Sequence, residues 1–431
     1  MVGSGGREHA LCWALQKTSG RPLELFCAPG NAGIEQLAES VPISVTNNDA
    51  LATFAEQSRI DLTVVGPEGP LAAGIVDHFR NRALRIVGPA QAAARLESSK
   101  AFAKDFMKRH AIPTARYRIV SSAEEGARVL QAGEFGDQET PVVIKADGLA
   151  AGKGVFVAAN RAGAVDALNE LKSGVVGAAA AQRIIIEEAL RGREVSLLLF
   201  SDGQDFRLMP AARDHKRVGE NDTGPNTGGM GSITDASVLD DSTRDRIVRE
   251  VIEPTLQGCS AESLPFQGIL FVGLMLTAEG PRVLEYNVRF GDPETQAILV
   301  RLKSDLREIL QAITEARLSS VPVNWSDESS ACVVLASRGY PAGAETGVTI
   351  SGLDRASQRD FTTIFHSATA RGENGEWLTA GGRVLGVTAT GENLDLALSR
   401  CYGAVGNIQW DGMHYRRDIG RQVETGASAK G

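Results

Sequence analysis

Short apolar runs alternate with stretches of helical periodicity over the first hundred residues. Residues 23–28, 62–65 and 85–87 have the mostly apolar character of buried strands, and each run is followed by proline or glycine. Residues 9–18 and 71–82, which lie between such runs, repeat their apolar positions with the period of a helix. This order predicts a parallel, doubly wound sheet that binds ligands at the carboxyl ends of its strands.

Strands dominate the remainder of the chain. A helix capped by Ser98 or Ser99 is expected to end near His110. Residues 325–330 are mostly polar and predict a linker to a smaller α+β domain, and the segment after Gly420 predicts a mobile tail. The expected strands are residues 142–145, 155–158, 184–187, 194–200, 207–210, 269–277, 282–290, 331–337, 362–366 and 383–388, with a further helix over 295–302.

Charge and cysteine usage narrow the class of protein. The length of 431 residues allows two to four domains. A net charge of −8 argues against a nucleic-acid or anionic-membrane surface, so any phosphate site must be a local pocket. The five cysteines are scattered without a CxxC pair, which fits a reducing compartment and disfavours a cysteine zinc site. With no signal peptide and no apolar run of membrane-spanning length, we expect a cytoplasmic protein.

The first glycine-rich loop, GSGGRE at residues 3–8, has two of the three glycines of a dinucleotide fingerprint. Glu8 occupies the third position and no acidic residue ends the second strand, so NAD binding is disfavoured. A glycine turn ahead of a helix still offers N–H groups to a phosphate. Asn31 taken alone is better explained as a turn residue. The sugar-phosphate pocket expected here comprises Gly5, Gly6, Arg7, Glu8, Asn31 and Glu68.

A second glycine-rich segment, PVVIKADGLAAGKGVFV at residues 141–157, lies between two expected strands. It is not a Walker A loop, because Gly148 and Gly152 are one residue too close and a strand follows instead of a helix. A hairpin with a glycine-rich tip can fold over a triphosphate while a lysine at the strand end contacts phosphate oxygens. The alternative is a surface hairpin with solvated lysines. The residues expected to contact nucleotide are Lys145, Gly152, Lys153 and Gly154.

Acidic residues gather where the expected strand 184–187 meets the following loop. The main chain near Glu187, Glu188 and Leu190 can bind an adenine edge, and Glu194 can bind ribose hydroxyls. The alternative is an edge strand with solvated carboxylates.

The segment VLEYNVRFGDPE at residues 283–294 gives the sharpest local signal. In a strand, Glu285, Asn287 and Arg289 point to the same face because side chains alternate with a period of two. A carboxylate and an amide oxygen are hard ligands suited to Mg²⁺, which takes its other oxygens from water and nucleotide phosphates. Arg289 beside them can bind a phosphate or carboxylate in a bidentate manner. We therefore expect a metal held by Glu285 and Asn287.

A long loop over residues 214–231 is rich in small residues that allow the backbone to approach a ligand closely. Asp214 can hold an amine and Lys216 an anion. Loops of this length are uncommon unless they bind something. The substrate contacts expected on this loop are Asp214, Lys216, Pro225, Asn226, Thr227, Gly228 and Gly229.

Taken together, these motifs closely resemble the phosphoribosylamine–glycine ligase family (glycinamide ribonucleotide synthetases) of the ATP-grasp superfamily. DHKR with GPNTGGMG, and NVRFGDPETQ, are diagnostic within that superfamily. The resemblance implies an ATP-grasp fold: an N-terminal doubly wound parallel α/β domain (1–98), an ATP-grasp domain (99–324) with a mobile lid subdomain at about 114–190, a C-terminal α+β domain (325–420) and a tail (421–431). The matching stretches are GSGGREHA, APGNAG, VVGPEGPL, SKAFAKDFM, VVIKADGLAAGKGV, EEALRGREVSLL, DHKRVGENDTGPNTGGMG, VLEYNVRFGDPETQ, CVVLASRGYP and TAGGRVLGVTA.

The resemblance also implies a reaction. ATP, with Mg²⁺ or Mn²⁺, drives ligation of glycine to 5-phosphoribosylamine through glycyl phosphate, the second step of purine synthesis. Lys104 and Lys145 would hold phosphates, and Asp292 would lie at the substrate site. Lys145, Arg289 and Asp214 would be the catalytic residues. The expected partners are these small molecules only, with no nucleic acid or membrane, and the expected state is a monomer.

Four departures from the family pattern concern local detail. The first strand is expected to be short or to begin upstream of Met1. Arg213 stands where Gln is usual, which would add a positive charge beside the substrate site, and Ile233 stands where an aromatic residue is usual. Residues 269–277 contain no carboxylate, so the second acidic metal ligand of some related ligases is absent.

Three other functions are alternatives. The closest is another ATP-grasp carboxylate–amine ligase or carboxylase of purine synthesis, which the DHKR and GPNTGGMG motifs disfavour. An inactive nucleotide-binding sensor is disfavoured by the presence of Lys145, Glu285 and Asn287. A dehydrogenase is the weakest.

Overall fold

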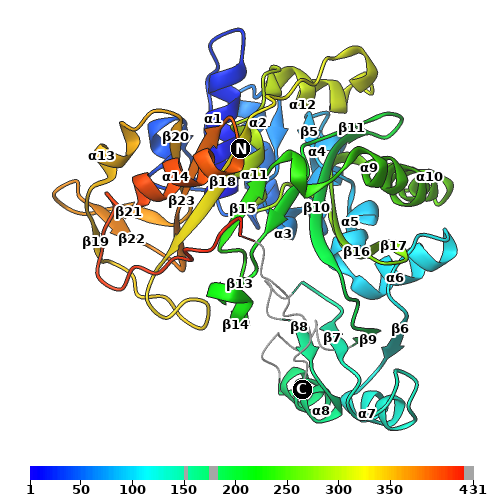
Figure 1. Ribbon diagram of the computed structural model, residues 1–431. Coiled ribbons are helices and arrows are strands. Elements are labelled where there is room, and N and C mark those ends of the chain that lie inside the picture. Colours follow the sequence, from blue (N-terminus) through cyan, green and yellow to red (C-terminus); the bar gives the residue numbers. More distant parts are fainter. Residues whose placement is uncertain (150–153, 174–182, 422–431) are drawn as a thin grey trace.

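The computed structural model describes residues 1–149, 154–173 and 183–421. An N-terminal α/β region, a small four-stranded sheet and a long central sheet that continues into the C-terminal region make up the fold (Figure 1). The mixed α/β and α+β arrangement expected from the sequence is therefore confirmed. Gly152, Lys153 and residues 422–431 of the expected tail lie outside the described residues.

The N-terminal region has the parallel strands that the alternating pattern predicts. β1 pairs with β2 and β2 with β3, β4 pairs with β5, and a bridge between Val2 and Val65 joins the two sets. The helix expected over 71–82 is wrong as a single element, because Gly74 has φ +79° and divides it into α3 and α4. The bounds are β1 Val2–Gly3, α1 Gly6–Thr18, β2 Phe26–Pro29, β3 Glu39–Ser40, α2 Asn48–Gln57, β4 Thr63–Val64, α3 Glu68–Ala72, α4 Ile75–Asn81, β5 Ile86–Val87 and α5 Gln91–Ser98.

A small sheet of order β6-β9-β7-β8 follows α6, with α7 and α8 packed around a core of its own (Figure 1). The Ser99 hydroxyl accepts a hydrogen bond from Phe102 N at 3.1 Å, which confirms the expected cap of α6. The bounds are α6 Lys100–Arg109, β6 Tyr117–Val120, α7 Ala123–Gln131, β7 Val142–Ala146, β8 Val155–Ala158, α8 Arg161–Lys172 and β9 Ile184–Glu188.

One nine-stranded sheet runs through the central and C-terminal regions. Its order is β17-β16-β10-β12-β15-β18-β23-β20, and β11 pairs with β10. The pairing of β15 with β18 joins the two regions edge to edge, so the C-terminal region adds strands to the central sheet. The bounds are β10 Arg193–Asp202, β11 Phe206–Leu208, β12 Ala212–Asp214, β15 Gly231–Thr234, α9 Asp241–Ile247, α10 Glu253–Ala261, β16 Gln267–Thr277, β17 Gly280–Asn287, α11 Glu294–Leu299, α12 Leu306–Thr314, β18 Ser329–Ala336, β19 Thr349–Ile350, α13 Leu353–Ser357, β20 Thr362–His366, β21 Thr369–Arg371, β22 Trp377–Thr379, β23 Arg383–Gly391 and α14 Leu394–Val405.

Two expected elements need correction. The strand predicted over 282–290 ends at Asn287, because Val288 N donates to the Glu97 carboxylate at 2.8 Å instead of to a neighbouring strand. The long loop expected at 214–231 contains an antiparallel pair, β13 Arg217–Gly219 with β14 Thr223–Asn226. Side-chain pattern alone does not distinguish so short and polar a hairpin from a loop.

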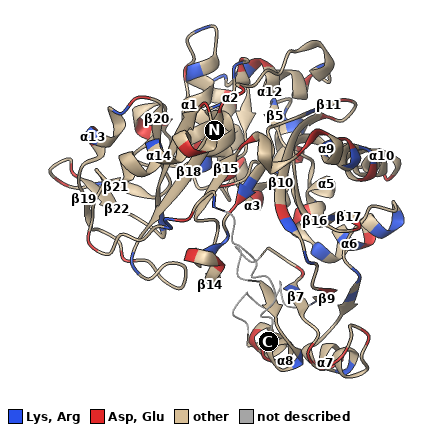
Figure 2. Cartoon of the chain, in the orientation of Figure 1, with Lys and Arg blue, Asp and Glu red and all other residues tan. Residues whose placement is uncertain are grey.

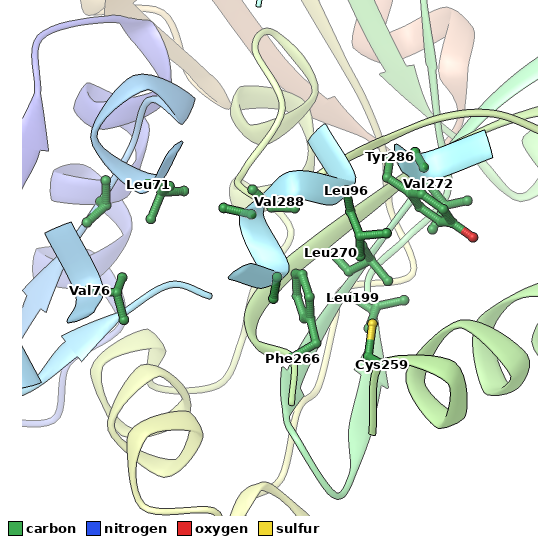
Figure 3. Close-up of a cluster of buried hydrophobic side chains, with 14 of the residues drawn as sticks. Leu71, Val76, Leu96, Leu199, Cys259, Phe266, Leu270, Val272, Tyr286 and Val288 are labelled. Carbon is green, nitrogen blue, oxygen red and sulfur yellow. The ribbon is translucent and has the colours of Figure 1, made fainter. Parts of the chain in front are cut away.

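A continuous hydrophobic cluster holds the N-terminal region against the central sheet. Leu71 and Val76 of the N-terminal helices belong to the same cluster as Leu270 and Val272 of β16, with Leu96 between them (Figure 3). Burial of this apolar surface packs α5 against β17. Among the described residues, no helix has the length and apolar character needed to cross a membrane.

Candidate active site

Charged residues of both signs meet between the central sheet, the small sheet and the N-terminal region. Figure 2 shows acidic and basic positions on the ribbon around β10 and α3. Side chains that the sequence singles out on β7, β9, β10 and β17, and on the loop after β12, meet here through ion pairs.

Two lysines share one buried carboxylate at the small-sheet side. Glu187 Oε2 lies 2.8 Å from Lys104 Nζ, and Glu187 Oε1 lies 2.9 Å from Lys145 Nζ. Burial lowers the pKa of Lys104 to about 8, against the opposing effect of Glu187. Although burial acts in the opposite direction, Lys145 and Lys104 lower the pKa of Glu187 below its usual range. Two cations and one anion leave this cluster with an excess positive charge, which suits a phosphate ligand.

The burial of Glu187 contradicts the alternative of an edge strand with solvated carboxylates at this position. Its side chain lies between the two lysines, and β9 is flanked by β6 and β7. The main-chain role expected for Glu187 stays a prediction. The Glu188 carboxylate accepts a hydrogen bond from Arg116 N at 2.8 Å. Leu190 lies partly exposed between β9 and β10. Glu194 is half exposed and pairs with Lys216 Nζ at 3.2 Å.

The expected metal ligands lie at the end of β17. Lys145 Nζ donates to Leu284 O at 3.2 Å, which links the lysine cluster to the residue before Glu285. Although burial acts in the opposite direction, Lys216, Lys145 and Lys100 keep the pKa of Glu285 below its usual value, so this carboxylate is charged. Asn287 Oδ1 accepts a hydrogen bond from Arg289 Nη2 at 3.2 Å.

A carboxylate and an amide oxygen two residues apart on one strand fit a hard divalent cation. Gly273, which has no side chain, pairs with Glu285 across the sheet, so this neighbour offers no second acidic ligand. Among the described residues, no group of three or more His, Cys, Asp and Glu side chains could hold a metal. A cation at Glu285 and Asn287 would therefore need oxygens from a bound phosphate or water to complete its ligand set.

Asp214 and Lys216 extend from β12 into the same cleft. Burial, and secondarily the nearby Glu294, raises the pKa of Asp214 well above its usual value. Glu194, and then Glu285 and Asp214, raise the pKa of Lys216. Lys216 Nζ lies 3.8 Å from Glu285 Oε1. A small pocket lined by Asp214, Lys216, Glu194 and Ser196 opens at this point.

The N-terminal glycine turn faces the cleft through Arg7. Arg7 Nη1 donates to Phe290 O at 2.8 Å. The Glu8 carboxylate accepts a hydrogen bond from Gly5 N, and burial raises its pKa. Asn31 Oδ1 accepts from Gly33 N at 2.8 Å and its Nδ2 donates to Ser4 O at 2.7 Å. Both ends of the Asn31 side chain thus hold the turn, and substrate binding by Asn31 and Glu8 stays a prediction.

Four residues of the cleft were missed by sequence reasoning: Glu97, Glu294, Tyr340 and Arg383. Arg289 Nη2 lies 3.0 Å from Glu97 Oε1, and Arg289 Nε lies 3.3 Å from Glu68 Oε2. The charge of Arg289 is thus balanced by two carboxylates, a finding that the shared strand face could not reveal.

Arg383 joins the C-terminal region to the substrate loop and to Asp292. Its Nη1 donates to Gly228 O at 2.6 Å and to Asp292 O at 2.7 Å, and its Nη2 lies 3.3 Å from Asp292 Oδ2. Gly228 N also donates to the Tyr340 hydroxyl at 2.9 Å. The only available sequence signal was an arginine after two glycines in TAGGRVLGVTA.

Arg213, one of the residues that depart from the family pattern, points to the opposite face of β12 from Asp214, because side chains of neighbouring strand residues alternate. Its Nη2 donates to Arg421 O at 3.2 Å. The expectation that Arg213 adds a positive charge beside the substrate site is therefore wrong. Ile233, the other departure, is buried in the C-terminal core.

Comparisons with known proteins find similar sequences over nearly the whole chain. Family models described as the N domain, the ATP-grasp (A) domain and the C domain of phosphoribosylglycinamide synthetase match residues 1–97, 98–295 and 330–422. The chain is 45% identical to the phosphoribosylamine–glycine ligase of Brucella melitensis over 427 residues, with 98% of each chain covered. It is 47% identical to that of Haemophilus influenzae over 430 residues, again with 98% of each covered.

Solved structures place the fold in the same group. The crystal structure of a phosphoribosylamine–glycine ligase from Thermotoga maritima matches with a TM-score of 0.83 and 33% identity, covering 97% of this chain and 98% of that one. The biotin carboxylase domain of 2-oxoglutarate carboxylase from Hydrogenobacter thermophilus matches with a TM-score of 0.69 at 15% identity, over 96% of this chain and 90% of that one. The second likeness shows the fold alone.

Proposed function

Since this chain belongs to the phosphoribosylglycinamide synthetase family, we propose that the cleft between β7, β10 and β17 carries out its reaction, with the residue roles given below. The protein is an ATP-dependent C–N ligase of purine biosynthesis, which joins glycine to 5-phosphoribosylamine and forms glycinamide ribonucleotide, ADP and phosphate. The observation that carries the assignment is the 3.2 Å contact of Lys145 Nζ with Leu284 O, which connects a phosphate-binding lysine pair to the strand of Glu285.

Lys104 and Lys145 would hold the β- and γ-phosphates of ATP. Both amines already lie within 3 Å of Glu187, so their side chains are ordered before nucleotide binds. A positioned charge costs less reorganisation during reaction than one that must be recruited from solvent. The main chain near Glu188 and Leu190 would bind adenine, and Glu194 the ribose.

Glu285 and Asn287 would hold Mg²⁺, or Mn²⁺ in its place, together with phosphate oxygens. When bound, this ion supplies charge neutralisation on the β- and γ-oxygens. Glu285 is charged and Asn287 is fixed by Arg289, so both ligands are oriented by this chain itself.

We propose two chemical stages. A glycine carboxylate oxygen bonds to the γ-phosphorus as the bond to ADP breaks, giving glycyl phosphate. The amine of phosphoribosylamine then bonds to the glycyl carbonyl carbon, and phosphate leaves. Asp214 would hold a substrate amine, and its raised pKa makes it a better acceptor for the proton that the amine loses. The substrate loop, Arg289 and Asp292 would orient the aminosugar phosphate with the α1 N-terminus.

A coupled ADP-release assay with glycine and freshly made phosphoribosylamine tests the proposal. Sustained ADP release should require both substrates, because the second stage clears the acyl phosphate. Bicarbonate and β-alanine serve as matched alternative acids. Release supported equally by either of them without glycine would point to a different ATP-grasp reaction.

We further propose a monomer in the cytoplasm. All five cysteines are free and buried, which supports a reducing compartment. Sedimentation equilibrium at micromolar concentration tests the oligomeric state.

A further inference from the structure

The hairpin β13–β14 has little to stabilise it from within. Its strands are three and four residues long, and the turn that joins them, Glu220–Asp222, has no buried residue. Asn221 and Asp222 both have left-handed backbone conformations, with φ of 56° and 53°. A two-stranded hairpin alone is marginally stable in water, so the order of this one must come from outside it.

The segment His414–Arg421 supplies those outside contacts. Arg416 is fully buried, and its Nη1 donates to Arg217 O at 3.1 Å and to Asp222 Oδ1 at 2.7 Å. Its Nε and Nη2 form a bidentate pair with Asp418 at 2.8 and 2.7 Å. Asp418 Oδ2 also accepts a hydrogen bond from Asn221 N at 2.8 Å. Both strained residues of the turn are thus held by one arginine–aspartate pair.

His215 makes a second connection at the base of the hairpin. Its Nε2 must accept the hydrogen bond from Gly420 N at 3.1 Å, which puts the ring proton on Nδ1. Nδ1–H then donates to Gly231 O at 3.2 Å. Burial lowers the pKa of His215 to about 4, so the ring remains neutral and keeps this orientation at neutral pH.

The holding segment is itself anchored to a helix. The Tyr402 hydroxyl of α14 donates to Arg416 O at 3.0 Å and accepts from Ile419 N at 3.1 Å. Rigid structure therefore extends from α14 through Arg416 to the hairpin. At the base of the hairpin, Thr227 N donates to Lys216 O at 2.8 Å, so the hairpin directly supports the backbone of a cleft residue. In Figure 1 the pair β13–β14 extends below β15.

We propose that Arg416 and Asp418 form a clasp that positions Lys216 and Asp214 for substrate binding. Arg416 is a positioning residue, because it contacts the hairpin and does not enter the cleft. The inference rests on the proposed role of Lys216 and Asp214 at the substrate site. Chain segments about two hundred residues apart thereby act together at one site.

Asp222→Ala is the most informative variant. It removes the charged hairpin-side partner of Arg416 at a half-exposed position, while Arg217 O remains as an acceptor. The bidentate pair with Asp418 stays intact, so the buried arginine keeps a counterion. The KM for phosphoribosylamine or glycine should rise at least threefold, while the KM for ATP changes less than twofold. Amide hydrogen exchange of residues 216–226 should become faster. Asp222→Glu, which keeps the carboxylate, should show much less of this rise in substrate KM.

Arg417→Ala is the matched control. It removes the positive charge of the exposed residue next to Arg416, where the guanidinium lies over Tyr415 and away from the clasp, and it should leave all three KM values unchanged. Lys216→Ala distinguishes failure of the proposed substrate site from failure of the clasp. If it changes neither the KM for glycine nor the KM for phosphoribosylamine, the proposed role of Lys216 is wrong. If Lys216→Ala raises a substrate KM but Asp222→Ala alters neither KM nor exchange, the clasp is refuted.

Discussion

The buried cluster of Lys104, Glu187 and Lys145 makes a quantitative test of the structure possible. Glu187→Gln keeps the shape of the side chain but removes the carboxylate charge that pairs with both lysines within 3 Å. Removing one partner of a buried ion pair typically destabilises a protein by about 3–5 kcal/mol. At pH 6, where both lysines of the unfolded chain are charged, we expect the free energy of unfolding to fall by an amount in the upper part of this range.

The destabilisation caused by Glu187→Gln has an upper limit that depends on pH. Lys104 can escape by losing its proton, and its ordinary pKa is 10.5. At about 1.36 kcal/mol per pH unit, deprotonation costs about 6 kcal/mol at pH 6 and about 3.4 kcal/mol at pH 8. The wild-type pKa of Lys104 is lowered to about 8, so the folded wild type keeps this proton over most of the interval. The folded variant loses it earlier, so its stability rises with pH between 6 and 8 relative to wild type.

Urea-induced unfolding followed by circular dichroism at pH 6 and pH 8 measures the free energy of unfolding of wild type and of Glu187→Gln. The difference between wild type and Glu187→Gln should fall to about 3 kcal/mol or less at pH 8. Glu188→Gln, one residue further along the strand and partly exposed, is the matched control and should cost less than about 1 kcal/mol at either pH. A difference below 1 kcal/mol at pH 6, or one that grows toward pH 8, would refute the buried cluster.

Three further predictions concern the reaction itself. Glu285→Gln should lower kcat by orders of magnitude while the circular dichroism spectrum is retained, because the charged metal ligand is lost; activity near wild type across a metal titration would show that the ligand assignment is wrong. Amide exchange in β7 and β8 should slow when a non-hydrolysable ATP analogue binds, because the small sheet then closes on the phosphates; equal protection with and without the analogue would exclude a lid role. With glycine labelled by ¹⁸O in its carboxylate, the label should appear in released phosphate beside ADP; AMP and pyrophosphate, or unlabelled phosphate, would overturn the acyl-phosphate route.

Much of the fold could be predicted from local pattern. The expected strand 362–366 matches β20 residue for residue, and the Ser99 cap of α6 is in place. Hydrophobic periodicity and capping depend on neighbours in the sequence, so they can be read before the chain folds. The same patterns placed Glu285 and Asn287 on one strand and Lys145 at the end of another.

Ion pairing across the cleft could not be predicted in this way. Arg289 has the right spacing for a phosphate ligand, yet Glu97 and Glu68 lie beside its guanidinium. Glu187 looked like a surface carboxylate at a strand end, yet it is buried between two lysines. Each partner comes from a distant segment, and sequence spacing carries no information about such distances.

The sequence by itself determined the alternation of strands and helices in the N-terminal region, many of the later strands, the family, and the residue types that can bind phosphate and metal. These follow from periodicity, turn chemistry and contiguous motifs, all of which are local. Only the tertiary structure decided that β15 pairs with β18, that Arg383 reaches Gly228, and that Arg416 holds the hairpin of the substrate loop. Those contacts exist because burial of shared apolar surface brings remote segments together, and the buried charges must then find partners within hydrogen-bond distance.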